Sequence, residues 1–121
     1  MVYLLLLAIL KINYPMSFVL RVIEPKGILD GTKTTEFQEQ LNKIIDSGAQ
    51  IVLVDFKDVT FMDSSGLGAL VKALKTVEAA DVKLFLCSMN EQIKILFELT
   101  SMDRYFKVYN DREEFKQQFQ Q

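Results

Sequence analysis

The stretch Ile51–Val54 carries an apolar side chain at every position and is rich in β-branched residues. Such a run is typical of a central strand covered on both faces, as strands of parallel sheets are. A second apolar stretch, Val82–Cys87, predicts another buried strand. Because helical patterns separate the two, right-handed crossover connections are expected. The sequence therefore predicts an α/β domain with a largely parallel sheet.

Apolar residues at helical spacing mark the helices between these strands. A first helix is expected after Asp30-Gly31-Thr32, with Gly48 just past its end. A second helix begins near Asp63, after a predicted loop over residues 57–62. The apolar stripe of the first helix consists of Phe37, Leu41, Ile44 and Ile45. That of the second helix consists of Leu67, Leu70, Val71 and Leu74.

The two ends of the domain carry their own signals. Phe18–Ile23 alternates like a strand, and the turn signal Pro25-Lys26-Gly27 leads into Ile28-Leu29, which predicts an opening hairpin. A last strand is expected within residues 105–109. Capping-box spacing predicts two more helix starts, at Ser88 with Glu91 and at Asp111 with Glu114. We expect one domain with a central mixed, mostly parallel β-sheet and about four helices packed on it.

The composition excludes several classes of function. The 121 residues carry a formal net charge of -2 without a long run of either sign, so direct binding of nucleic acid is not expected. Histidine is absent, which removes the commonest general base and the commonest zinc ligand. The single cysteine, Cys87, excludes an internal disulfide and predicts a buried thiol in a cytoplasmic protein. We expect no metal and no cofactor.

The first residues form an apolar extension. The run Val2–Leu10 is about half as long as a membrane-spanning helix requires, and it lacks the charged start and small-residue cleavage site of a signal peptide. Met16 precedes an ordinary strand pattern, and we interpret residues 1–15 as a mis-assigned start of translation or a poorly ordered extension. We therefore divide the chain into an extension, residues 1–16, and a domain, residues 17–121. An extra edge strand and an interfacial anchor are the alternatives for the extension.

The segment Asp63-Ser64-Ser65-Gly66 stands at the start of the second helix. Amide hydrogens of a first helical turn lack internal partners, so side-chain oxygens, carboxylates and phosphates are favoured there. A serine-hydrolase site does not fit, because the glycine pattern is wrong and no histidine exists. A dinucleotide loop fits poorly, because Gly68 falls inside the helix and Val71 stands where a glycine is needed. A phospho-acceptor serine and plain helix capping by Asp63 and Ser64 both remain open.

Three blocks of the sequence resemble one known family. They are Phe61–Gly68 with its preceding strand, Gly27-Ile28-Leu29-Asp30, and the stretch from Ser88 to Phe106. Together they resemble STAS domains, specifically the bacterial anti-sigma-factor antagonists, over residues 17 to about 119. Departures from the family pattern include Ile28, which stands where glutamate is usual, and Met89, which replaces a proline.

The resemblance implies a STAS-type fold and a switch without catalysis. It identifies Ser65 as the phosphorylated residue, with Ser64 as second choice. An anti-sigma factor serine/threonine kinase would bind the unmodified chain, a PP2C-type phosphatase would reset it, and transcription would be regulated indirectly by partner switching. The residues expected at the partner interface are Asp30, Thr32, Asp63, Ser64, Ser65, Gly66 and Leu67.

Two other classes of function are weighed against this switch. STAS-like domains also serve as regulatory subunits of membrane transporters, where a membrane protein would be the partner. An enzyme that uses carboxylates alone is disfavoured, because Asp55, Asp58 and Asp63 form no paired acidic motif and no metal-ligand spacing. For Asp30 and Thr32, turn formation and helix capping compete with partner contact.

Overall fold

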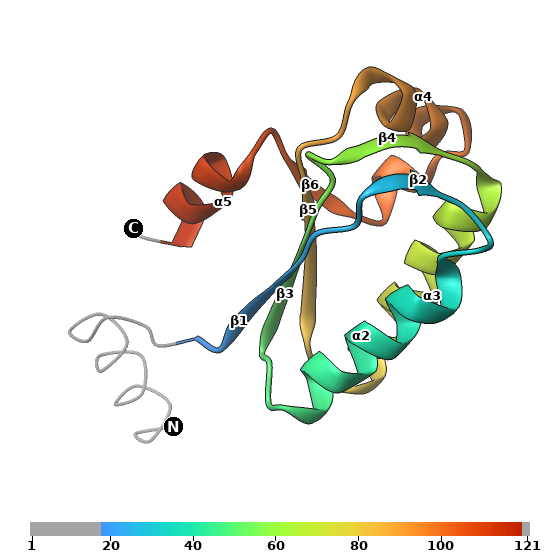
Figure 1. Ribbon diagram of the computed structural model, residues 1–121. Coiled ribbons are helices and arrows are strands. Elements are labelled where there is room, and N and C mark those ends of the chain that lie inside the picture. Colours follow the sequence, from blue (N-terminus) through green and yellow to red (C-terminus); the bar gives the residue numbers. More distant parts are fainter. Residues whose placement is uncertain (1–17, 120–121) are drawn as a thin grey trace, which may run out of the picture.

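The computed structural model describes residues 18–119, and the predictions for the N-terminal extension concern residues outside this range. Strands and helices alternate along most of the chain (Figure 1). In chain order the elements are β1 (Leu20–Ile23), β2 (Gly27–Leu29), α2 (Thr34–Asp46), β3 (Ile51–Asp55), β4 (Val59–Met62), α3 (Ser64–Ala79), β5 (Lys83–Cys87), α4 (Glu91–Leu99), the short 3-10 helix η1 (Met102–Arg104), β6 (Lys107–Tyr109) and α5 (Arg112–Phe119).

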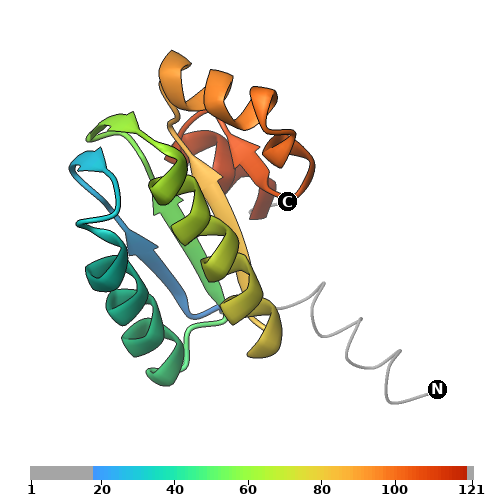
Figure 2. The same ribbon diagram turned by 90° about the vertical axis from the view of Figure 1, so that its right-hand side faces the viewer.

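The strands form a four-stranded sheet in the order β1-β3-β5-β6 and a two-stranded sheet of β2 and β4. Each strand pair within the described residues is parallel. Helices α2 and α3 lie on one face of the larger sheet, and α5 lies on the other (Figures 1 and 2). The predicted α/β fold, with a mostly parallel sheet and four helices, is confirmed.

The predicted opening hairpin is wrong. β1 pairs with β3, and β2 pairs with β4, so the chain bends at Pro25 without reversing its direction. Pro25 has no amide hydrogen for a ladder, and Gly27 adopts a positive φ of 73°. The Gly27 amide donates to the carbonyl of Asp58 at 2.8 Å, which joins the two continuing strands. β2 and β4 therefore both extend toward the start of α3.

β4 replaces the loop predicted for residues 57–62. Only its two ends, Val59 and Met62, are buried, so the segment lacks the alternation that marks a half-buried strand. Its partner β2 lies about thirty residues earlier and has only three residues. Pairing between two such short segments is a tertiary effect, which local patterns do not reveal.

Both faces of the central strand are covered, as predicted. Val52 and Val54 belong to the main core beneath α2 and α3, whereas Ile51 and Leu53 belong to a second cluster that α5 covers. Cys87 lies in that second cluster and is completely buried. Burial raises the pKa of its thiol to about 11, so the group is a protonated, inert core residue at neutral pH.

One of the two predicted capping boxes is displaced. Asp111 caps α5 as expected, accepting from the Glu114 amide at 2.8 Å. α4, however, is capped by Asn90, whose Oδ1 accepts from the Ile93 amide at 3.0 Å. The side-chain amide of Asn90 also donates to two carbonyls of β4. These hydrogen bonds place the helix cap at Asn90, two residues after Ser88.

A buried carboxylate joins α5 to the main sheet. Asp55 at the end of β3 is 1% exposed, and its Oδ2 accepts from Arg112 Nε at 2.7 Å. The other oxygen accepts from the Lys57 amide at 3.0 Å. Arg112 also pairs with Glu24, which follows β1. The first residue of α5 is therefore bound to the ends of two strands of the sheet.

Candidate functional site

Asp63 holds the start of α3 as its N-cap. Its backbone is extended, and its Oδ1 accepts from the Ser65 amide at 2.9 Å and from the Gly66 amide at 3.0 Å. The Asp63 amide in turn donates to the carbonyl of Leu29 at the end of β2. The capping role predicted for Asp63 is confirmed, and it fixes where the next two serines lie.

Ser64 and Ser65 are the first two residues of α3, and both are exposed. Within residues 18–119, neither hydroxyl makes a hydrogen bond to another residue. Each hydroxyl is therefore available to an incoming group, at a helix start whose dipole favours negative charge. This is the chemistry that a phospho-acceptor requires.

The loop between β2 and α2 lies next to Ser65. A Cβ placed on Gly31 would stand 3.7 Å from both Cβ and Oγ of Ser65. On either side of Gly31, Asp30 Oδ1 accepts from the Thr32 amide at 2.9 Å and from the Thr32 hydroxyl at 2.5 Å. These bonds to Thr32 lower the pKa of Asp30, so its carboxylate is charged at neutral pH. Asp30 and Thr32 thus form a turn that lies beside Ser65.

Gly66 and Leu67, both predicted at the partner interface, are buried. A Cβ on Gly66 would stand only 2.3 Å from the carbonyl oxygen of Leu29, so glycine is needed for α3 to approach β2. Leu67 is 7% exposed and belongs to the main core. These two residues contribute to the site by positioning α3, because Gly66 has no side chain and the side chain of Leu67 is buried.

Removing the cap should weaken the fold without removing the serines. We expect Asp63→Ala to lower the free energy of unfolding by about 1 kcal/mol, because two first-turn amides lose their acceptor. Urea denaturation followed by circular dichroism measures this loss. Asp63→Asn keeps an acceptor oxygen and should lose only a few tenths of that amount. Equal midpoints for Asp63→Ala and the unchanged chain would contradict the capping role.

Ser65 stands at one end of a hollow of about 450 Å³ between α2 and α3. We call this the Ser65 hollow; its lining residues are Gly31, Thr34, Thr35, Gln38, Glu39, Ser65, Gly68, Ala69 and Lys72. Lys72 makes no ion pair within residues 18–119. The α2 side of this hollow was missed from the sequence, because it depends on how the two helices pack.

Two exposed apolar side chains lie on the strands that lead into the site. Ile28 on β2 and Phe61 on β4 are register partners, with 52% and 45% of their surfaces exposed. The sequence interpretation missed this pair because it placed Phe61 in a loop. Large apolar groups exposed together are typical of surfaces that contact other proteins.

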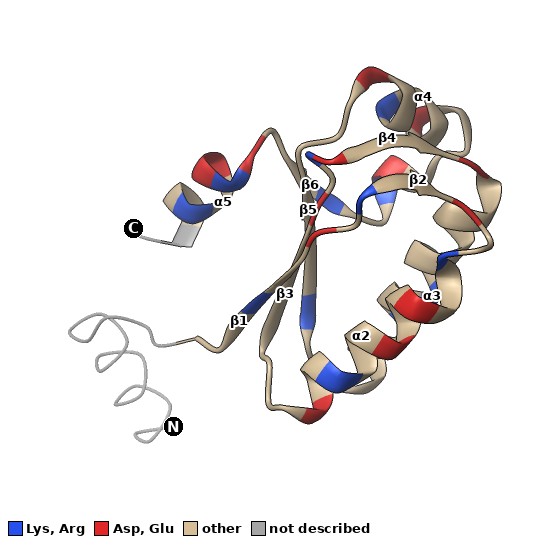
Figure 3. Ribbon diagram, viewed as in Figure 1, with Lys and Arg blue, Asp and Glu red and all other residues tan. Residues whose placement is uncertain are grey.

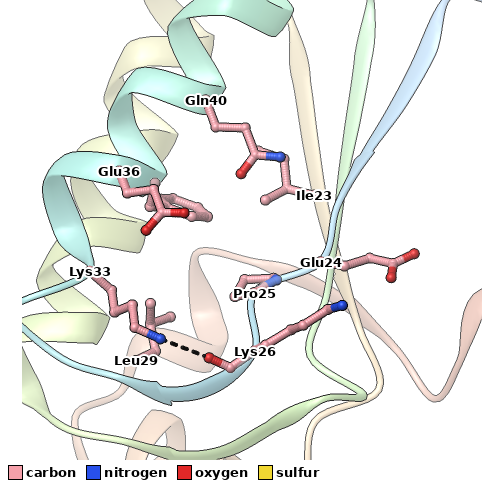
Figure 4. A pocket seen from close by; sticks show the side chains of 9 residues that line it. Ile23, Glu24, Pro25, Lys26, Leu29, Lys33, Glu36 and Gln40 are labelled. Atoms are coloured by element: carbon pink, nitrogen blue, oxygen red, sulfur yellow. Dashed lines mark hydrogen bonds between the residues drawn. The ribbon is translucent and has the colours of Figure 1, made fainter.

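A second cavity, of about 290 Å³, lies between α2 and the segment that joins β1 to β2 (Figure 4). Its lining does not include Ser65. Lys33 points toward the carbonyl of Lys26 and donates to it at 3.1 Å, which holds that segment against the start of α2. The cavity is therefore separate from the Ser65 hollow.

Charges of both signs are distributed along the chain, and acidic segments follow the ends of β2 and β4 (Figure 3). Among residues 18–119, no three His, Cys, Asp or Glu side chains gather closely enough to hold a metal ion. In the same part of the chain, every helix is too short or too polar to reach across a bilayer.

Comparison with known sequences agrees with the resemblance found in the motifs. The family model of the STAS domain matches residues 11–115. An anti-sigma-B factor antagonist of Staphylococcus aureus (strain NCTC 8325) is 33% identical over 76 residues. That alignment covers 63% of this chain and 70% of the relative.

Solved structures share the fold at lower identity. An anti-sigma factor antagonist of Mycobacterium paratuberculosis superposes with a TM-score of 0.75 at 14% identity, over 88% of this chain and 90% of that one. The phosphorylated form of the Bacillus cell fate determinant SpoIIAA gives 0.63 at 19%, over 84% and 93%. The STAS domain of a SulP transporter from Vibrio cholerae gives 0.65 at 18%, over 79% and 77%.

Proposed function

Because the chain belongs to the STAS domain family, among the anti-sigma factor antagonists, we propose that it is a phospho-switch whose acceptor is Ser65. In its unmodified form it binds an anti-sigma factor that is also a serine kinase, and phosphorylation of Ser65 releases it. A PP2C-type phosphatase resets the switch. The chain itself catalyses nothing and acts in the cytoplasm, where it regulates transcription through its partners.

The observation that carries this proposal is the environment of the Ser65 hydroxyl. It is exposed at the second position of α3, lacks a hydrogen-bond partner within residues 18–119, and opens onto the Ser65 hollow. A kinase can therefore reach it without unfolding the helix. One solved neighbour, SpoIIAA, has been determined in a phosphorylated form, which supports the proposal.

Phosphate at this position acts on the interface more than on the fold. It adds roughly -1.5 to -2 charges at neutral pH, close to the carboxylate of Asp63, which caps the same helix. The dipole of α3 stabilises that charge in the free chain. Burying it against a partner requires desolvation, and a cost of about 3 kcal/mol already weakens binding more than a hundredfold.

The direct test is phosphorylation in a defined mixture. The purified chain is incubated with each anti-sigma factor kinase of its source organism, with ATP and Mg²⁺, and the modified residue is mapped by mass spectrometry. We expect one phosphate, on Ser65, from at least one kinase. Phosphate on Ser64 alone would overturn the choice of acceptor.

A regulatory subunit of a membrane transporter is the second candidate, because the fold is shared with the SulP transporter domain. That function requires no kinase. Absence of phosphate with every kinase, together with stable binding to a purified transporter, would favour it over the switch.

A further inference from the structure

Two glycines lie in the first turns of α3, and the fold requires glycine at only one of these positions. Gly66 is buried against the Leu29 carbonyl, and no larger residue fits there. Gly68 is exposed, and a Cβ at its position would meet no atom within 4 Å. Glycine inside a helix is less stable than alanine because its backbone loses more freedom on folding. The fold of the isolated chain therefore gives no reason for glycine at position 68.

Gly68 lies three residues after Ser65, about 4.5 Å farther along the helix axis, and both residues line the Ser65 hollow. Phosphoryl transfer requires the γ-phosphate of ATP to come within about 3–3.5 Å of the serine oxygen. An enzyme that brings ATP so close must also cover the neighbouring turn of α3. Whatever stands at position 68 therefore meets the kinase surface.

We propose that the anti-sigma factor kinase packs a segment directly onto the bare backbone of α3 at Gly68, so that the missing side chain is a determinant of docking. This inference rests on the proposed function. Gly68 presents only backbone at this place, and the next residue, Ala69, is buried. A methyl group at position 68 would occupy the space of the partner, although it is harmless in the free chain.

The inference predicts changes of opposite sign in stability and in binding. Gly68→Ala should raise the melting temperature by about 3–6 °C, and it should raise the Kd for the kinase at least about tenfold, as overpacking of a close contact does. Gly68→Gln should raise the Kd by about a hundredfold or more. The matched control is Ala79→Gln, at the exposed far end of α3, whose Kd should stay within about twofold of the unchanged chain.

Differential scanning fluorimetry and calorimetric titration with the purified kinase give both quantities. A more stable variant that binds less tightly cannot be explained by damage to the fold. If the unchanged chain binds the kinase and is phosphorylated on Ser65, but Gly68→Ala and Gly68→Gln bind as tightly, the contact at Gly68 is wrong and the switch stands. If the unchanged chain neither binds nor accepts phosphate from any kinase, the switch fails and the contact with it.

Discussion

Ser65→Glu is expected to raise the Kd of the chain for its kinase by about a hundredfold or more, whereas Ser65→Ala should leave the Kd nearly unchanged. Glutamate places a fixed charge close to the carboxylate of Asp63, and that charge must lose water when the partner covers it. Alanine removes only the acceptor oxygen. Ser65→Ala should therefore bind the kinase persistently and take up no phosphate. Calorimetric titration and phosphate mapping measure the two effects.

The control for net charge is Asn42→Asp, on the exposed surface of α2. Its new carboxylate can still accept the hydrogen bond that Gln38 donates to Asn42 Oδ1. Because Asn42 does not line the Ser65 hollow, this variant should bind the kinase within about twofold of the unchanged chain. Equal weakening by Asn42→Asp and Ser65→Glu would show that total charge, and not its place at the site, controls binding.

Arg112→Met is expected to cause a large loss of stability at a place away from the site. It leaves the carboxylate of Asp55, 1% exposed, without its cation. Removing one partner of a buried ion pair costs about 3–5 kcal/mol. The Arg112 side chain is 33% exposed, and water will offset part of that cost, so we expect a loss of about 2–3 kcal/mol in the free energy of unfolding. Urea denaturation measures it.

Two further variants test the cause of that loss. Asp55→Asn combined with Arg112→Met should recover most of the stability, because asparagine has no charge to bury and can still accept from the Lys57 amide. Lys94→Met removes an exposed pair with Glu91 and should cost less than about 0.5 kcal/mol. A double variant no more stable than Arg112→Met would mean that α5 depends on packing of the arginine side chain.

Local chemistry was enough to predict the parts of the fold that local patterns control. The all-apolar run at Ile51–Val54 predicted a strand covered on both faces, and Asp63 before an apolar stripe predicted the N-cap of α3. Both were confirmed. The predicted hairpin was wrong because Pro25 and Gly27 indicate that the chain changes direction, but they do not determine the angle of the bend. The start of α4 was displaced because Asn90 is held by carbonyls of β4, a contact that depends on the whole fold.

The candidate site, too, could be predicted from the sequence only in part. The motif and its resemblance to the family identified the serines, and the structure places them at an exposed helix start. The proximity of Gly31 to Ser65, the hollow shared by α2 and α3, and the exposed pair Ile28 and Phe61 all come from packing between distant segments. The different roles of Gly66 and Gly68 could not be separated by sequence, because the difference lies in what surrounds each Cα.

Helix α5 ends on the side of the sheet away from α2 and α3 (Figure 1). A fluorophore or affinity handle attached beyond Phe119 should therefore stand clear of Ser65. The chain can be immobilised through that end on a sensor surface while Ser65 faces the solution. Successive additions of kinase with ATP, and then of phosphatase, would allow one captured sample to be followed through repeated cycles of modification and recovery.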